Sequence, residues 1–387
     1  MARRAAVGLG IGIVLALGVV AAEEQQRASP PGADRRAAVT SDARPPLHEQ
    51  SRTVSREERM EAIARAHVWR APEIPIARAP LGRHPGTPAE LACRFKIGPL
   101  GGTTPKFRCA VGDGAEIRVK YGSAPEIPAE AAATKLLSAL GFGADIVALV
   151  ERVRCYGCPR EPFLTMKVVE STGTRGVYER VTDERAFQDF RWVAVEQRYE
   201  ARAIETEHDK GWSFVELASV DPSKGGAPRA HVDALRLMAV FLAHWDNKAD
   251  NQRLVCRSSR WPEGSRCPAP FLMLQDVGVT FGPRKVDLGA WEKAAVWEDR
   301  GRCTVSMRAL PYGGATFGSA RISERGRRFL VDLLGQLTDA QLADLFSAAR
   351  FDKHHRGLGR PAPISAWVRV FKQRLRALSD GPPCPLS

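Results

Sequence analysis

The sequence lacks a repeating pattern of basic and aromatic residues of the kind that proteins use to stack nucleic-acid bases. Its formal net charge of +13 therefore does not by itself indicate a nucleic-acid partner, and part of that surplus lies in an arginine-rich N-terminal segment. The charge favours acidic partners such as nucleotides. The 387 residues, 44% of them hydrophobic, suffice for two or three domains or for one large two-lobed domain. We expect no binding to nucleic acid.

The sequence also lacks the second short cysteine pair that a zinc ribbon requires. Its cysteines are even in number, and their spacing favours local disulfides. The pairs suggested are Cys93–Cys109, Cys155–Cys158 and Cys256–Cys267, which leaves Cys303–Cys384 by elimination. Eight cysteines allow many pairings, so spacing alone does not determine the connectivity. For "CYGC" at 155–158, a redox pair or half of a zinc site stays open.

Residues 1–22 have the layout of a secretory signal peptide. "MARR" supplies positive charge, an uninterrupted apolar run follows, and small residues precede cleavage after Ala22. The alternative is an uncleaved membrane anchor, because about 17 apolar residues are near the lower limit for spanning. No cysteine directly follows the apolar run, which argues against a lipoprotein anchor. We expect a secreted or periplasmic protein without stable membrane insertion after cleavage, or a membrane-anchored one if the signal is retained.

The rest of the chain divides into three parts. Residues 23–88 are rich in Pro and Arg and predict a mostly disordered linker, apart from a short helix in "REERMEAIARAHVW". Residues 89–175 predict a small sheet, including "KFRCAV", "AEIRVKYG" and "EPFLTMKVVE", with one inserted helix that starts near Pro128. Residues 176–387 predict mostly amphipathic helices. The expected fold class is α+β, with a small strand-rich lobe and a larger helical lobe, stapled by disulfides.

The stretch "FLAHWDNKADNQRLVC" places a cluster of polar residues between a predicted helix and a predicted strand. Phosphoryl transfer from a nucleotide needs a carboxylate for the attacking hydroxyl, a cation for the γ-phosphoryl and oxygen ligands for a metal. Asp246, Lys248 and Asn251 match these roles in order. His244 is interpreted as a structural residue of the loop. The alternative is that the cluster is only a polar turn without catalytic function, since Asn and Asp are common in bends.

A magnesium site needs a further oxygen ligand, and Asp276 in "LMLQDVGVTFG" supplies one after an apolar strand. Upstream, Lys120 ends an alternating strand, and Glu130 lies on the apolar face of the inserted helix, where it needs a cation. Glu126 is the alternative partner, and a solvated strand lysine is the ordinary interpretation of Lys120. Backbone N–H groups of "GPLGGTTP", which contains Gly101 and Gly102, could approach phosphates.

The order of these motifs over residues 91–350 resembles the protein kinase-like superfamily. "HWDNKADN" is similar to the eukaryotic catalytic loop, and "DVG" stands where that family has Asp-Phe-Gly. The signal peptide, the cysteines and "DVGVTFG" resemble the atypical secreted branch: Golgi casein-kinase-like secreted kinases, spore-coat CotH kinases and the HipA group.

The resemblance implies a bilobal fold with ATP between the lobes and Mg²⁺ or Mn²⁺ as cofactor. By it, Asp246 is the catalytic base and Lys248 contacts the transferred phosphate. Asn251 and Asp276 bind metal. Lys120 and Glu130 form an ion pair, as the residues themselves suggest. The expected partners are a nucleotide and a hydroxyl-bearing substrate.

Two features of that superfamily are absent from the sequence: a G-x-G-x-x-G before Lys120, and an Ala-Pro-Glu-like segment after "DVG". These departures leave open how the phosphates are held and whether the substrate is a protein, a small molecule or a glycan. Two further functions stay open on the same fold: a catalytically inactive binding domain and an AMP transferase.

Overall fold

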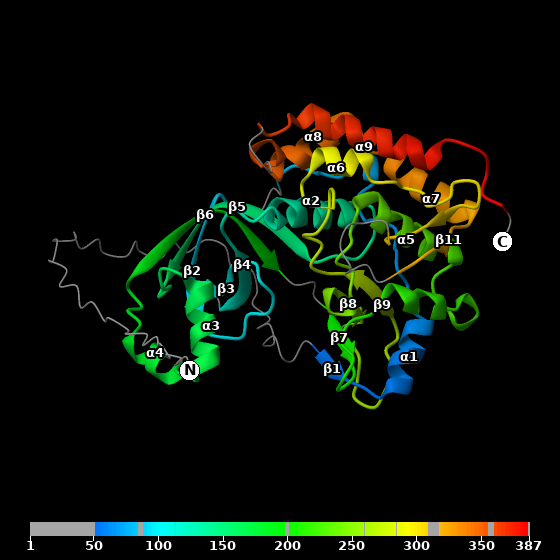
Figure 1. The fold of residues 1–387 in the computed structure, drawn as a ribbon. Helices are drawn as coiled ribbons and strands as arrows, with labels where there is room; N and C mark the ends of the chain where they lie inside the picture. The colour runs from blue at the N-terminus through cyan, green and yellow to red at the C-terminus, as the bar shows by residue number, and fades with distance from the viewer. Residues whose placement is uncertain are drawn as a thin grey trace, which may run out of the picture. The chain divides into compact units, whose positions relative to one another are not determined.

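The computed structural model describes residues 51–83, 88–112, 114–197, 201–258, 260–283, 285–308, 317–354 and 360–385. The expected signal peptide, residues 1–22, and the linker up to residue 50 lie outside the described residues. The described residues have mixed α+β structure, as predicted (Figure 1). They belong to one compact unit, Ala43–Ser387. No helix among these residues is long and apolar enough to cross a membrane.

Five strands form a closed barrel in the order β2-β3-β4-β6-β5. β2 and β5 are parallel, and the other neighbours are antiparallel. In β4, Ile117 and Val119 are buried in one apolar cluster with Phe107, which leaves Arg118 and Lys120 on the opposite face of the strand. The strands are β2 (Glu90–Lys96), β3 (Lys106–Val111), β4 (Ala115–Lys120), β5 (Ile146–Tyr156) and β6 (Phe187–Gln197).

Two expectations for the strand-rich region are wrong. "EPFLTMKVVE" forms helix α3 (Pro162–Thr172), which begins at a proline and ends at Gly173 with a φ of 65°, and α4 (Arg175–Val181) follows. The region therefore carries more than one helix. The boundary expected at residue 175 is also too early, because β6 completes the barrel. A short apolar run does not distinguish a strand from a helix by its periodicity alone.

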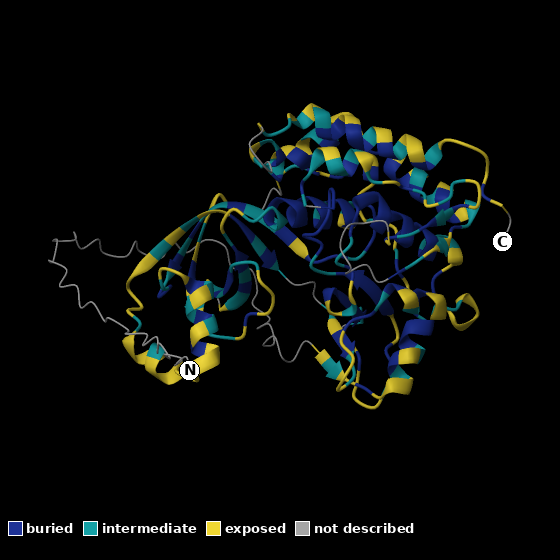
Figure 2. Cartoon of the chain, in the orientation of Figure 1, coloured by how far each residue is buried: buried dark blue, intermediate teal, exposed yellow. Residues whose placement is uncertain are grey.

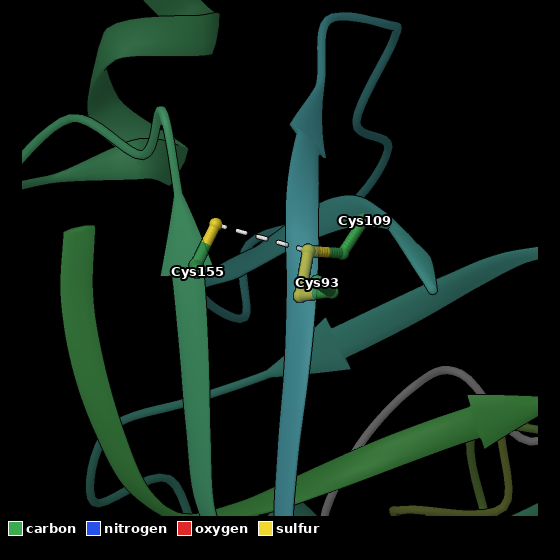
Figure 3. A group of neighbouring side chains, drawn as sticks. All are labelled: Cys93, Cys109 and Cys155. Atoms are coloured by element: carbon green, nitrogen blue, oxygen red, sulfur yellow. Dashed lines mark hydrogen bonds between the residues drawn. A yellow bond between two sulfur atoms is a disulfide. The ribbon is translucent and has the colours of Figure 1, made fainter. Parts of the chain in front are cut away.

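All eight cysteines form disulfides, with the connectivity that their spacing suggested. Cys93–Cys109 joins β2 to β3, and Cys155–Cys158 lies at the end of β5. Cys256–Cys267 and Cys303–Cys384 lie in the larger region. In the barrel the Sγ atoms of Cys109 and Cys155 are 3.7 Å apart (Figure 3). This gathering of sulfur is no metal centre, because each atom is in a disulfide and none is a thiolate. The interpretation of "CYGC" as half of a zinc site is therefore wrong.

The larger region is built around α5 (Arg229–Leu242), which is buried from Val232 onward (Figure 2). Arg374, itself buried, donates to the carbonyl oxygens of Phe241 and Val240 at 3.0 and 3.1 Å. These carbonyls belong to the last turn of α5, where C=O groups lack the N–H donor four residues on that they would have inside a helix. The surrounding helices are α6 (Leu288–Lys293), α7 (Glu324–Gly335), α8 (Asp339–Ala348) and α9 (Ile364–Ser379), which carries Arg374.

Helix α2 (Glu126–Ala139) follows β4 in sequence but belongs to the core of the larger region, in which Ala133, Leu136 and Leu137 are buried. A second sheet has the order β1-β7-β8-β9. Its strands are β1 (Ser51–Thr53), β7 (Arg202–Glu205), β8 (Gln252–Cys256) and β9 (Pro270–Leu274). The short elements are η2 (Ile76–Arg78), η3 (Phe214–Ser219), η4 (Pro222–Lys224), η5 (Ala249–Asn251), η6 (Phe351–Lys353), β10 (Thr304–Val305) and β11 (Ala320–Arg321).

Residues 51–83 are not linker, contrary to the prediction from composition. Helix α1 (Arg56–Ala64) was expected as a short docking helix, and Arg59 pairs with Glu216 at 2.7 Å. The segment beyond it is folded as well, because Val68 and Leu81 are buried in the core of the larger region. A segment that cannot form a core of its own can still pack on the apolar surface of another.

Candidate active site

The loop at 243–251 begins where α5 ends. Ala243 adopts a left-handed φ of 54° and caps the helix, so the chain turns sharply before His244. The backbone N–H of Phe281 donates to the carbonyl of Leu242 at 2.8 Å, and the indole of Trp245 donates to the carbonyl of Pro283 at 2.9 Å. These bonds hold the loop against the segment that follows Asp276.

His244 is buried and has a structural position, as expected. Burial lowers its pKa to about 4, so the imidazole is neutral at pH 7. Its Nε2 atom lies 3.5 Å from Nε2 of Gln252, at the start of β8. His244 therefore packs inside the protein under the loop and does not face solvent.

The three polar residues predicted in this loop lie together. Lys248 Nζ is 3.6 Å from Oδ1 of Asp246, and both side chains reach solvent. Asn251 donates from Nδ2 to the carbonyl of Asp246 at 2.7 Å. Because its amide nitrogen is used in this way, the amide oxygen of Asn251 is left for another partner, and it has no hydrogen bond to the described residues.

Asp276 follows β9, beside this loop. The N–H of Gln275 donates to the carbonyl of Asn251 at 3.0 Å, so the two candidate metal ligands come from adjacent chain segments. Asp276 has a left-handed φ of 50°, which is uncommon outside glycine and frequent at functional sites. Its side chain is 47% exposed.

Lys120 joins Asp276 to α2. Its Nζ atom lies 2.7 Å from both carboxylate oxygens of Glu130 and 3.0 Å from Oδ1 of Asp276. The Lys120 and Glu130 side chains are buried, at 4% and 2% exposure. The pair predicted from sequence is therefore formed, and it includes a third residue 156 positions away from the lysine.

The charges in this group determine one another's pKa. Burial alone would lower the pKa of Lys120, but the Glu130 and Asp276 carboxylates outweigh it and raise that pKa. For Asp276, the surrounding protein would raise the pKa, and the Lys120 ammonium lowers it to about 2. Burial raises the pKa of Glu130, and Lys120 opposes that shift through both carboxylate oxygens. At neutral pH Lys120 and Asp276 are therefore charged.

Glu126 is not the partner of Lys120. It begins α2 and accepts hydrogen bonds from Thr104 Oγ1 and Lys285 Nζ. Thr104 lies in the glycine-containing loop between β2 and β3, so Glu126 ties that loop to α2 and to the segment after Asp276. Glu130 is left as the partner of the strand lysine.

The two predicted glycines differ in their surroundings. Gly102 has a φ of 72°, and a Cβ atom at that position would lie 3.3 Å from Nζ of Lys106. Gly101 has open space where its Cβ would be. Both lie in the β2–β3 loop, and neither has a described contact with Lys120.

Sequence reasoning missed two cations beside Lys120. Arg118 pairs with Glu196 of β6 at 2.9 Å, and Glu196 in turn lies 3.9 Å from Lys120. Lys106, the first residue of β3, is the cross-strand neighbour of Lys120. The "VGDGA" turn was the available signal, because pairing Val111 with Ala115 across it sets Lys106 opposite Lys120.

A cavity of about 710 Å³ lies elsewhere, beside α2 and β5. Ala131 and Lys135 of α2 are among its lining residues, and none of the predicted site residues is. The candidate site is therefore identified by the charged side chains that meet there, and not by this cavity.

Comparison with known proteins adds little. No protein-family model matches the chain, and no curated protein matches it by sequence. Among solved structures, the crystal structure of the Helicobacter pylori proinflammatory kinase CtkA aligns with 75% of this chain and 96% of its own. The TM-score is 0.37 and the sequence identity 9%. At this level the match carries no inference about this chain's fold or activity.

Proposed function

We propose that this protein is an exported, kinase-like phosphotransferase that moves the γ-phosphoryl group of ATP to a hydroxyl group of its substrate. The barrel would be the smaller lobe and the helical region the larger one, with the nucleotide between them. One observation carries the proposal: Lys120 of the barrel contacts both Glu130 and Asp276, at 2.7 and 3.0 Å. A lysine fixed in this way presents a cation beside an acidic loop, as phosphate binding requires.

A divalent metal fits the donors of this site. Mg²⁺ prefers oxygen ligands and retains several waters. The half-exposed carboxylate of Asp276 and the free amide oxygen of Asn251, from adjacent segments, are the donors that would hold it. When bound, the metal would offset charge on the phosphate oxygens.

The remaining roles belong to the loop after α5. The Asp246 carboxylate reaches solvent and would accept a hydrogen bond from the substrate hydroxyl, orient it, and take its proton. Lys248, 3.6 Å from Asp246, would offset charge on the phosphoryl group during transfer. Lys120 would hold the phosphates of the nucleotide, and Glu130 would hold Lys120.

Export is part of the proposal. The four disulfides include all eight cysteines, which is typical of proteins that fold in an oxidising compartment. The sequence expectation of a signal peptide points the same way. A secreted or periplasmic location accounts for both.

The test is binding followed by transfer, with the full chain as it is exported. MgATP should raise the melting temperature, because a ligand of the folded state stabilises it by mass action. γ-Labelled ATP should then label the protein or release labelled phosphate, and α-labelled ATP should not label it. Asp246→Asn and Asp276→Asn should abolish labelling.

The matched control is Asp250→Asn, an exposed aspartate four positions from Asp246, which should keep the activity. Absence of any MgATP binding by the wild-type chain would rule out the proposed function. Binding without transfer of either label would indicate an inactive binding domain, and labelling from the α position would indicate AMP transfer.

A further inference from the structure

Lys106 is a buried lysine whose side chain has no partner in the part of the chain that the structure describes. The residue is 8% exposed, and its Nζ atom has no hydrogen bond or ion pair with the described residues. Its neighbour across the β3–β4 ladder is Lys120, so both side chains leave the same face of the hairpin. Lys120, by contrast, forms ion pairs with the carboxylates of Glu130, Asp276 and Glu196.

The ammonium of Lys106 lies at the candidate site. It is so close to the backbone of Gly102 that a Cβ there would be 3.3 Å from Nζ. Burial lowers the pKa of Lys106, the Lys120 charge lowers it further, and the Asp276 charge raises it. The charges of Lys120 and Asp276 therefore act on Lys106, and the glycine-containing loop lies beside its ammonium group.

The group holds three cations and three carboxylates, but Lys106 is in no ion pair with the described residues. Arg118 pairs with Glu196, and Lys120 pairs with Glu130. Lys106 is left without a carboxylate, and Asp276 faces solvent with half of its side chain. A largely desolvated cation without an ion-pair partner lowers the stability of the folded state, and an anion that enters from solvent would offset that loss.

We propose that Lys106 Nζ binds the phosphate groups of the nucleotide directly, as a second cation beside Lys120 and next to Gly102. This inference rests on the proposed function and names how the phosphates are held. The sequence has no G-x-G-x-x-G whose backbone would surround them. A lysine side chain packed against a glycine supplies the contact instead, because a glycine lets the ammonium approach the loop.

The experiment compares Lys106→Met with the wild-type full chain in two measurements. Calorimetry should show MgATP and inorganic tripolyphosphate binding at least about tenfold more weakly to Lys106→Met, the loss of one charge-assisted contact. Binding of adenosine, which has no phosphate, should not change. The melting temperature of the ligand-free variant should rise or stay equal, because methionine removes an unpaired buried charge.

Lys106→Gln, which removes the charge and keeps a donor, should weaken phosphate binding in the same way. The control is Lys96→Met, an exposed lysine on β2, which should change neither measurement. Unchanged MgATP affinity in Lys106→Met and Lys106→Gln would overturn the inference and leave the proposed function intact. A wild-type chain that binds neither MgATP nor tripolyphosphate would overturn both. A lower melting temperature with equal losses for adenosine and MgATP would make Lys106 a structural residue and overturn the inference.

Discussion

The barrel half and the helical half of the candidate site hold their charges differently. In the barrel half, Lys120 is buried and contacts Glu130 through two short bonds. In the helical half, Lys248 is 55% exposed and lies 3.6 Å from Asp246. Charges that are buried and paired are already ordered before a ligand arrives, while exposed ones are free to bind it. Changes to the buried pair should therefore lower the stability of the fold, whereas changes to the exposed pair should affect mainly the proposed reaction.

The two regions also differ in how they are stabilised. The larger region buries many aromatic side chains in one core, among them Trp291, Phe241 and Phe371. The barrel core is much smaller, and it contains two disulfides whose sulfur atoms approach to 3.7 Å. A small domain that buries little apolar surface commonly depends on disulfides. The barrel should therefore be the region more sensitive to reduction.

The largest effect on stability is expected from Lys120→Met. The change leaves the Glu130 carboxylate buried without its cation, and such a broken pair costs about 3–5 kcal/mol of the free energy of unfolding. Urea unfolding measures the loss. The double variant Lys120→Met/Glu130→Gln should recover most of it, since the uncompensated charge is then gone. A double variant as unstable as the single one would mean that the buried pair is not the cause.

A second effect should distinguish the disulfides of the two regions. The loops closed by Cys93–Cys109 and Cys256–Cys267 have similar lengths, with separations of 16 and 11 residues. Chain entropy therefore predicts a similar loss of about 3 kcal/mol when either pair is changed to alanine. Hydrogen exchange should differ, however, because β2–β6 should lose protection when the barrel pair is removed. Equal exchange in the two variants would remove the distinction between the regions.

A third effect concerns His244 in the helical half. Its pKa in the folded protein is lowered to about 4 by burial, from an ordinary value of 6.5. The unfolded chain thus binds the extra proton more readily, and stability is complete above about pH 6.5 and lost as the pH falls towards 4. The loss is about 3 kcal/mol at most. Asp276, with a pKa of about 2, stays ionised throughout this window.

Unfolding free energies at pH 7 and pH 4.5 test this expectation. His244→Asn should reduce the difference between the two, because the substituted residue does not titrate. His208→Gln, at an exposed histidine, is the control and should leave the difference as in the wild type. A pH dependence identical in His244→Asn and wild type would show that the acid sensitivity arises elsewhere.

The smallest effect on stability is expected from the exposed pair in the helical half. Lys248→Met should change the free energy of unfolding by less than about 1 kcal/mol, because solvent screens the pair with Asp246. A double-mutant cycle with Asp246→Asn measures the coupling directly, and it should also stay below about 1 kcal/mol. A coupling as large as that of Lys120 with Glu130 would contradict the contrast between the two halves.

Local pattern in the sequence was sufficient for several parts of this structure. The disulfide pairs followed from short separations, which favour pairing because closing a short loop costs little entropy. The pair of Lys120 with Glu130 followed from a carboxylate on an apolar helix face, where a cation is needed. Helix α5 and the loop after it followed from an apolar period that ends in polar residues.

Local pattern failed where a segment's environment decided its structure. Residues 51–83 have a linker's composition, yet Val68 and Leu81 find their apolar partners in the larger region. The apolar run that became α3 fits a strand equally well, and β6 was hidden in a stretch without a clear period. In each case the deciding contact lies far away in the sequence, so no window of neighbouring residues contains it.

What the sequence by itself determined is the chemistry available to this protein: the acidic and basic side chains near residues 120, 130, 246 and 276, and the cysteines that pair across short loops. Tertiary structure alone decided which of these charges meet. Lys106 lies beside Lys120 because of strand register, and Asp276 contacts Lys120 because two distant chain segments pack together. Electrostatic energy depends on distances of a few ångströms in space, and separation along the chain does not fix those distances.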